Sequence, residues 1–323
     1  MARDGSGVKD AEKITEIHVK SQEIGKDYAL YCGDSCEILQ GIPENSIHYS
    51  IFSPPFESLY TYTNSDRDLG NCRNGGEFHE HFRFIVEQLY RVIMPGRLVS
   101  FHCMNLPTSK ERDGFIGIRD FRGELIKLFQ DAGFIYHSEV CIWKDPVTAM
   151  QRTKALGLLH KQLKKDSCMS RQGIPDYLVT MRKPGENPER VTHTNESFPV
   201  RVWQQYASPV WTDINPSDTL QYKSARENED ERHICPLQLT VIRRGLELWT
   251  NKNDIVLTPF MGIGSEAYMA VKMNRRAVGI ELKDSYYRQA VANVKEATKE
   301  RQPDLFDFLQ PEKGDEADVS VDA

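Results

Sequence analysis

The chain has 323 residues, of which 39% are hydrophobic and 27% are charged, and its formal net charge is -6. This length suits one α/β domain with an insertion or two small domains, and it excludes a peptide-sized scaffold. No apolar run approaches the roughly 18 to 20 residues that cross a membrane, and the first residues lack the apolar segment of a secretory signal. The cysteines are odd in number and scattered, which predicts a reduced protein of the cytoplasm without a disulfide framework.

The first half of the chain alternates between strand and helix patterns. Residues 1–25 are polar and aperiodic and are expected to form a flexible tail, and regular structure begins near Tyr28. A polar stretch at 57–78 is expected to form a long loop. In chain order, the apolar spacing predicts strand 48–53, helix 79–94, strand 97–102, helix 120–132 and strand 134–143. This run indicates a sheet that is parallel in part, with residues 26–144 as its first half.

Residues 145–232 lose this alternation and are rich in Pro, Arg, Lys and Trp, so we interpret them as an inserted region. Pro236 suits the first position of a helix, and regularity returns there. The following pattern predicts helix 236–250, strand 254–258, helix 265–273, strand 277–282 and helix 285–299. Residues 233–302 therefore form the second half of the domain, and residues 303–323 are expected to form an acidic flexible tail.

The net charge is unevenly distributed. Residues 303–323 carry seven acids and one base, which accounts for the whole net charge. Residues 151–190 carry nine bases against four acids. The acidic balance of the chain therefore does not exclude a nucleic-acid partner at 151–190, although composition alone favours a solvated basic face there.

A turn with two glycines, Thr258-Pro-Phe-Met-Gly262-Ile-Gly264-Ser265, lies between a predicted strand and a predicted helix. Glycines let the backbone approach a ligand, and the free N–H groups of a helix N-terminus attract an anion. Glu281 ends the next predicted strand, where an acid can accept hydrogen bonds from both hydroxyls of a ribose. Together these features predict a nucleoside-containing cofactor. Taken singly, the glycines also fit a packing turn, and Glu281 fits a solvated acid.

The tetrapeptide Ser53-Pro54-Pro55-Phe56 directly follows the first predicted strand. Two prolines remove backbone donors and leave carbonyl acceptors, while Ser53 adds a hydroxyl and Phe56 a flat surface on which a base can stack. The lone pair of an exocyclic amine on an aromatic base is delocalised into the ring. Acceptors that bind its hydrogens draw the nitrogen toward tetrahedral geometry and free that lone pair. The alternative is an ordinary Pro-Pro loop.

Together, SPPF after a strand, the downstream PFMGIGS turn and GIEL resemble the amino-group DNA methyltransferases that use S-adenosylmethionine. The catalytic tetrapeptide precedes the cofactor glycines, which resembles the permuted β group of these enzymes. In that group the target-recognition region lies between the two halves, where this chain has its basic region. The resemblance covers roughly residues 28–298. It implies a doubly wound, mostly parallel Rossmann-like sheet of the α/β class with an inserted target-recognition region.

The resemblance also implies the cofactor-binding residues. Phe260, Gly262 and Gly264 would line the methionine and ribose, Glu281 would hold the ribose hydroxyls, and Asp34 would face the adenine amine. The residues that would complete the pocket are Pro236, Gln238, Thr258 and Ser265. Members of the family usually have Asp where this chain has Thr258, so one charged contact to the methionine amine is missing.

The catalytic residues follow in the same way. Ser53 and the carbonyl of Pro54 would polarise the target amine, Pro55 would fix the corner, and Phe56 would stack on a base flipped from the duplex. Adenine-specific members usually have Asp or Asn in place of Ser53, and serine is more usual for cytosine. The sequence therefore favours N4 of cytosine over N6 of adenine as the target.

The expected partner is double-stranded DNA. Six basic residues of the inserted region are expected to contact phosphates, namely Arg152, Lys154, Lys161, Lys164, Lys165 and Arg171. The spacing of Cys and His matches no zinc ligand set, so no metal site is predicted. A homodimer and a restriction endonuclease partner stay open. Two other functions also stay open: methylation of RNA or of a protein amide, and a catalytically silent DNA-binding module.

Overall fold

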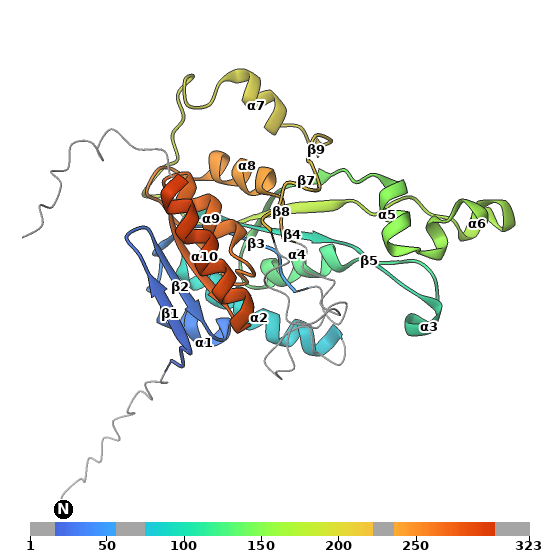
Figure 1. Cartoon of the computed structure of the whole chain (residues 1–323), viewed down its shortest axis with the longest axis horizontal. Helices are drawn as coiled ribbons and strands as arrows, with labels where there is room; N and C mark the ends of the chain where they lie inside the picture. Colours follow the sequence, from blue (N-terminus) through green and yellow to red (C-terminus); the bar gives the residue numbers. More distant parts are fainter. Residues whose placement is uncertain (1–16, 56–74, 222–235, 301–323) are drawn as a thin grey trace, which may run out of the picture.

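The computed structural model describes residues 17–55, 75–221 and 236–300, and it shows one twisted sheet with helices on both faces (Figure 1). The order across the sheet is β1 (Ser21–Ile24), β2 (Tyr28–Cys32), β11 (Arg276–Glu281), β10 (Ile255–Thr258), β3 (Ile47–Phe52), β4 (Ile93–Met104), β8 (Asp176–Arg182), β7 (Ile135–Ile142) and β9 (Val210–Trp211). A separate small pair joins β5 (Leu106–Pro107) to β6 (Ile118–Arg119).

The helices are α1 (Ser35–Ile38), α2 (Gly75–Val92), α3 (Lys110–Asp113), α4 (Phe121–Asp131), α5 (Pro146–Thr153), α6 (His160–Lys165), α7 (Val200–Tyr206), α8 (Leu239–Trp249), α9 (Ser265–Lys272) and α10 (Asp284–Glu300). Short 3₁₀ turns occupy Leu39–Gly41, Leu156–Leu158 and Ser167–Met169. None of the helices in these ranges combines the length and the apolar character that a membrane crossing requires.

The strands β2, β11, β10, β3 and β4 are parallel neighbours, whereas β8 runs antiparallel between β4 and β7, and β1 runs antiparallel along β2. The expected α/β class and mostly parallel sheet are therefore confirmed. Because the carboxyl ends of parallel strands meet at one edge, the chain segments after β2, β3, β10 and β11 lie together there.

Alternating side chains of the strands fill a core on each face of the sheet. Tyr49 and Ile51 of β3 pack in the cluster that α8, α9 and α10 cover, through residues such as Val241 and Ala290. Phe52 packs on the opposite face, in the cluster that includes residues of α1, α2 and α4. The buried side chains Phe82, Ile85, Val86 and Leu89 of α2 confirm the apolar spacing that predicted this helix.

The region 145–232 contributes two strands to the sheet, which the sequence pattern did not predict. β8 lies between β4 and β7, and Leu178, Val179 and Met181 are buried there. The strand is apolar on both faces because helices cover both sides of the sheet, so it shows no alternating pattern. The parts of region 145–232 that lie outside β8 are thus the segment between β7 and β8 and the segment that follows β8.

Three predicted boundaries differ from the structure. α2 begins at Gly75, within the expected loop, and β4 begins at Ile93, before the expected helix stop. α8 begins at Leu239 rather than at Pro236, because Asp218 caps it from a distant part of the chain. The carbonyl of Asp218 accepts from the N–H of Leu239 over 2.8 Å, and its carboxylate accepts from the N–H of Thr240 over 2.9 Å.

Candidate active site

The serine corner after β3 and the glycine turn after β10 leave the sheet at the same edge. β3 and β10 are parallel, with Ser50 opposite Leu257. At this edge, the ring of Phe52, the last residue of β3, lies 5.7 Å from the ring of Phe260, which follows β10, and Phe260 also packs 6.1 Å from Phe82. The structure therefore brings together the two sequence motifs that predicted a catalytic corner and a cofactor turn.

Ser53 is partly exposed immediately after β3, Pro54 behind it is buried, and Pro55 is partly exposed. The hydroxyl of Ser53 contacts Nδ1 of His102 at 3.2 Å. Phe52 pairs with Phe101 across the parallel strands β3 and β4, so the residues that follow them lie side by side. Phe56, the fourth residue of the tetrapeptide, lies outside the described residues.

Two further side chains stand behind His102, and the sequence pattern did not indicate either. Nε2 of His102 lies 3.0 Å from Oδ2 of Asp176, and Nζ of Lys144 lies 2.5 Å from Oδ1 of the same carboxylate. Burial alone would raise the pKa of Asp176, but the charges and hydrogen bonds of His102 and Lys144 outweigh burial and lower that pKa. Asp176 is therefore an ionised buried carboxylate at neutral pH.

The glycine turn has a backbone that only glycine adopts without strain. Gly262 has φ +55°, and a Cβ on it would meet no atom of residues 17–55, 75–221 or 236–300 within 4 Å, so these parts of the chain leave open space above it. Gly264 is the N-cap of α9 with φ +87°, and a Cβ there would lie 3.0 Å from Cβ of Ala290. Gly262 thus leaves room for a ligand at the turn, while Gly264 allows close packing of α9 against α10.

Glu281 at the end of β11 is held by the turn that it faces. Its Oε2 accepts from the N–H of Gly262 over 2.8 Å, and its Oε1 accepts from the N–H of Lys283 over 2.9 Å. Asp34 follows the neighbouring strand β2, which pairs with β11 so that Cys32 lies opposite Glu281. Oδ1 of Asp34 accepts from the N–H of Cys36 over 2.8 Å and caps α1. Two acids are therefore fixed at adjoining strand ends.

Three buried polar atoms of the predicted pocket have no hydrogen-bond partner among the described residues: Oγ1 of Thr258, Oγ of Ser265 and Oε1 of Gln238. Gln238 is the N-cap of α8 without a side-chain capping bond, and Pro236 lies partly exposed just before it. Buried polar groups are normally paired, so these atoms fit a polar ligand over the open turn. A nucleoside cofactor with a charged methionine end is such a ligand.

Glu266, in the first turn of α9, is buried beside this pocket. Burial raises the pKa of its carboxyl to about 8, although a backbone hydrogen bond acts in the opposite direction. The side chain is therefore mostly protonated and neutral at pH 7. It does not replace the negative charge that Thr258 lacks.

The expected DNA contacts lie beyond the carboxyl ends of β4 and β7. Figure 1 shows α3, α5 and α6 projecting on that side, away from β1 and α10. The side chains of four predicted contacts are exposed there, namely Lys154, Lys161, Lys164 and Lys165. Arg171 is partly buried and donates to the carbonyl of Gln172 over 3.1 Å, which makes it a weaker candidate. Arg152 belongs to α5, but its side chain lies outside the described atoms.

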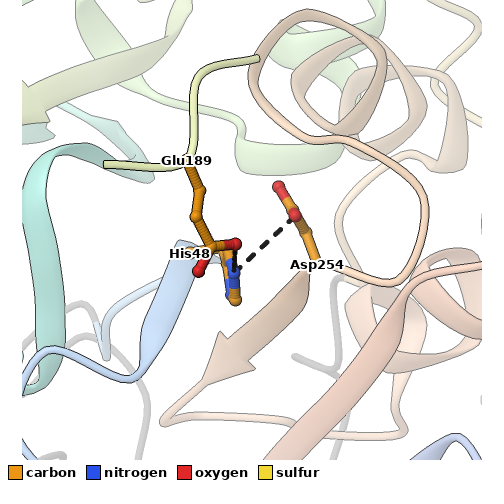
Figure 2. A group of neighbouring side chains, drawn as sticks. All are labelled: His48, Glu189 and Asp254. Carbon is orange, nitrogen blue, oxygen red and sulfur yellow. Dashed lines mark hydrogen bonds and ion pairs between the residues drawn. The ribbon is translucent and has the colours of Figure 1, made fainter. Parts of the chain in front are cut away.

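Among the described residues, His48, Glu189 and Asp254 form the one group with ligand atoms close enough to share a metal ion (Figure 2). Nε2 of His48 lies 2.9 Å from Oε2 of Glu189 and 3.8 Å from Oδ1 of Asp254. Arg97 donates to the carboxylate of Asp254, and the N–H of Ile255 donates to Nδ1 of His48 over 3.1 Å. Because Arg97 already balances Asp254, we assign this group to linking β3, β4 and β10 at their amino ends, away from Ser53.

Comparison with known proteins agrees with this geometry. The family model N6_N4_Mtase, described as DNA methylase, matches residues 47–292. The chain is 24% identical over 286 residues to the type II methyltransferase M.BglII of Bacillus subtilis, covering 87% of this chain and 72% of that protein. It is 22% identical to the type II methyltransferase M.HpaI of Haemophilus parainfluenzae, covering 82% and 73% respectively.

Two solved structures share the fold. TTHA0409 of Thermus thermophilus, solved in complex with S-adenosyl-L-methionine, superposes with a TM-score of 0.60 at 20% identity, over 83% of this chain and 95% of that chain. PvuII DNA methyltransferase, described as cytosine-N4-specific, superposes with a TM-score of 0.60 at 14% identity, over 88% and 95%. The chain belongs to the N6_N4_Mtase DNA methylase family. This confirms the expected class, an S-adenosylmethionine-dependent methyltransferase of DNA amino groups.

Proposed function

We propose that this enzyme methylates N4 of cytosine in duplex DNA at a specific sequence. The observation that carries the choice of base is Ser53 directly after β3, where a neutral, partly exposed hydroxyl lies 3.2 Å from Nδ1 of His102. A related fold described as cytosine-N4-specific supports this choice. Methylation of N6 of adenine is the alternative, because a hydroxyl can accept one hydrogen bond from either amine.

S-adenosylmethionine would lie over the glycine turn. Each carboxylate oxygen of Glu281 has two lone pairs, so it would accept from the ribose hydroxyls alongside its bonds to Gly262 and Lys283. Thr258, Ser265 and Gln238 would supply polar atoms, and Asp34 would contact the adenine from the end of β2. When bound, the sulfonium supplies an already activated methyl group, so the protein has mainly to position its partner.

The serine corner would hold the target amine. The hydroxyl oxygen of Ser53 and the carbonyl of Pro54 would accept the two amine hydrogens, which weakens conjugation with the ring and makes the nitrogen lone pair available. The base would have to leave the duplex to reach this corner, as in other enzymes that modify bases. The exposed lysines of α5 and α6 would then contact phosphates on the same side of the sheet.

The test is to incubate the purified protein with isotopically labelled S-adenosylmethionine and unmethylated genomic DNA, and to digest the DNA to nucleosides for mass spectrometry. We expect label in N4-methyl-2′-deoxycytidine. Label in N6-methyl-2′-deoxyadenosine would contradict the base assignment and keep the class of enzyme. Label in neither nucleoside would contradict the proposed function. A homodimer and a partner endonuclease stay predictions from the resemblance.

A further inference from the structure

The hydroxyl of Ser53 belongs to a series of contacting polar side chains that lie on four strands or just after them, β3, β4, β8 and β7. Its oxygen lies 3.2 Å from Nδ1 of His102 on β4, and Nε2 of that ring lies 3.0 Å from Asp176 at the start of β8. Lys144, which follows β7, completes the chain at Asp176. The His102 and Asp176 side chains are 11% and 4% exposed, so this contact is largely shielded from water.

The position of His102 between Ser53 and Asp176 determines which of its ring nitrogens carries the proton. Asp176 is ionised, because the charges and hydrogen bonds of His102 and Lys144 lower its pKa despite burial. An ionised carboxylate can only accept, so at 3.0 Å its charge favours the tautomer with hydrogen on Nε2, although the two atoms do not meet in hydrogen-bond geometry. Nδ1 then presents a lone pair to the hydroxyl of Ser53. The hydroxyl can donate to this lone pair while its own oxygen accepts from another group.

Few charged side chains lie around His102 among the described residues. Asp176 and Lys144 are the charged side chains in this chain of contacts. Cys103 and Tyr177, adjacent in sequence to His102 and Asp176, point to the opposite face of the sheet. There Arg122 lies 4.3 Å from the ring of Tyr177 and pairs with Glu139 at 3.0 Å. The charged side chains on the His102 side of these strands are therefore Asp176 and, through it, Lys144.

We propose that His102 is a positioning residue that orients Ser53 as an acceptor for the target amine and receives the proton that the amine loses, and that Asp176 holds His102 in the required tautomer. This inference rests on the proposed function. As the amine nitrogen bonds to the methyl carbon, the electron pair of the carbon–sulfur bond passes to sulfur. One N–H proton of the amine then moves to Oγ of Ser53, while the hydroxyl proton moves to Nδ1 of His102. Asp176 stabilises the imidazolium of His102, and His102 then releases the proton to water.

The arrangement also explains how a serine can stand where related enzymes have a carboxylate. A neutral hydroxyl is a weaker acceptor than an ionised carboxylate. A base behind the hydroxyl increases its negative character as the proton is transferred, in the same way that a histidine activates a serine in hydrolases. The amine would thus have a route for its proton without an acid at position 53.

The test measures single-turnover methyl transfer to DNA against pH for the wild type, His102→Asn and Lys144→Met. The rate of the wild type should fall toward acid pH as the ring takes up a proton. His102→Asn keeps an oxygen that can accept from Ser53 but has no basic nitrogen. It should be slower by about 100-fold or more and should lack the acid limb. Lys144→Met removes a positive charge that disfavours imidazolium, so its acid limb should move to higher pH.

Affinity for S-adenosylmethionine is measured for both variants and should match the wild type. Melting temperatures are measured as well and should fall, because each variant leaves the buried Asp176 with one partner fewer, so rates are compared at temperatures where both variants are folded. A His102→Asn variant with the rate and acid limb of the wild type would overturn the inference while leaving the proposed function intact. An acid limb at the same pH in Lys144→Met as in the wild type would also overturn the inference. If His102→Asn does not fold, the Lys144→Met result alone tests the inference. A wild-type protein that transfers no methyl group to DNA would overturn both the inference and the proposed function.

Discussion

The rings of Phe52 and Phe260 lie 5.7 Å apart, and they join the two segments that carry the chemistry of this protein. Phe52 precedes Ser53 directly, while Phe260 comes two residues before Gly262. The contact holds the end of β3 against the turn after β10, so an amine acceptor and a cofactor turn share one edge of the sheet. A methyl group held over the glycine turn would therefore lie close to an amine at the serine corner.

Replacing Gly262 with Val should weaken S-adenosylmethionine binding by about 10-fold or more, since a side chain would enter the open space above the turn and the backbone would be strained by about 1 to 2 kcal/mol. Isothermal titration calorimetry measures the affinity. Gly114→Val is the matched control, because Gly114 also has positive φ, +80°, and open space around it. If both variants lost the same affinity for S-adenosylmethionine, backbone strain would explain the loss, and Gly262 would not lie against the cofactor.

Replacing Thr258 with Asp should strengthen S-adenosylmethionine binding by about 10-fold, because a charge-assisted bond to the methionine amine contributes about 1.5 to 3 kcal/mol. Thr258 is 1% exposed, so the unpaired carboxylate should also lower the melting temperature of the free protein. Melting curves with and without the cofactor test both effects, and Thr258→Asn controls for shape. If Thr258→Asn bound S-adenosylmethionine more tightly than the wild type and Thr258→Asp did not, the charge argument would be refuted.

The lysines of α6 should contribute to DNA affinity without affecting cofactor binding. Replacing Lys161, Lys164 and Lys165 with Ala should weaken DNA binding and lower the slope of log affinity against log salt by about 0.9 for each phosphate that is no longer neutralised. Fluorescence anisotropy over a range of salt concentrations measures the slope. A control variant with equal charge loss replaces Lys252, Lys295 and Lys299. An unchanged slope for the α6 variant would place the DNA elsewhere.

Glu266 should make stability depend on pH. Burial raises its pKa in the folded state to about 8, from 4.5. The neutral form is favoured by folding, so its contribution is complete below the unfolded value and is lost as pH rises through the folded value. Glu266→Gln keeps a neutral side chain and should exceed the wild type in melting temperature above pH 8, with little difference near pH 4. A difference that is independent of pH would contradict this assignment.

The parts of the site that depend on short local patterns could be predicted from the sequence. Ser53 directly follows β3 and Gly262 follows β10 by four residues, and the motif around each residue is contiguous. His102 and Asp176 meet only because β8 pairs with β4 in a sheet whose order the chain pattern does not give. β8 itself was missed because burial on both faces removes the alternation that predicts a strand.

The start of α8 shows the same limit. Pro236 suggested a helix start, yet Asp218 determines it by accepting from the N–H groups of Leu239 and Thr240. The capping group is distant in sequence, so a local rule for helix ends could not identify it. Local motifs therefore located the catalytic corner and the cofactor turn, whereas the groups that support them required the tertiary structure.

The most direct test of the central claim compares the wild type with Ser53→Ala for single-turnover transfer of labelled methyl to DNA, at saturating S-adenosylmethionine. Ser53→Ala should bind cofactor and DNA as the wild type does, because Ser53 is a partly exposed residue outside both hydrophobic clusters. Its rate should fall by about 100-fold or more, since the hydroxyl that accepts the amine hydrogen and passes on its proton is lost. A rate equal to that of the wild type would contradict an active site built on this serine.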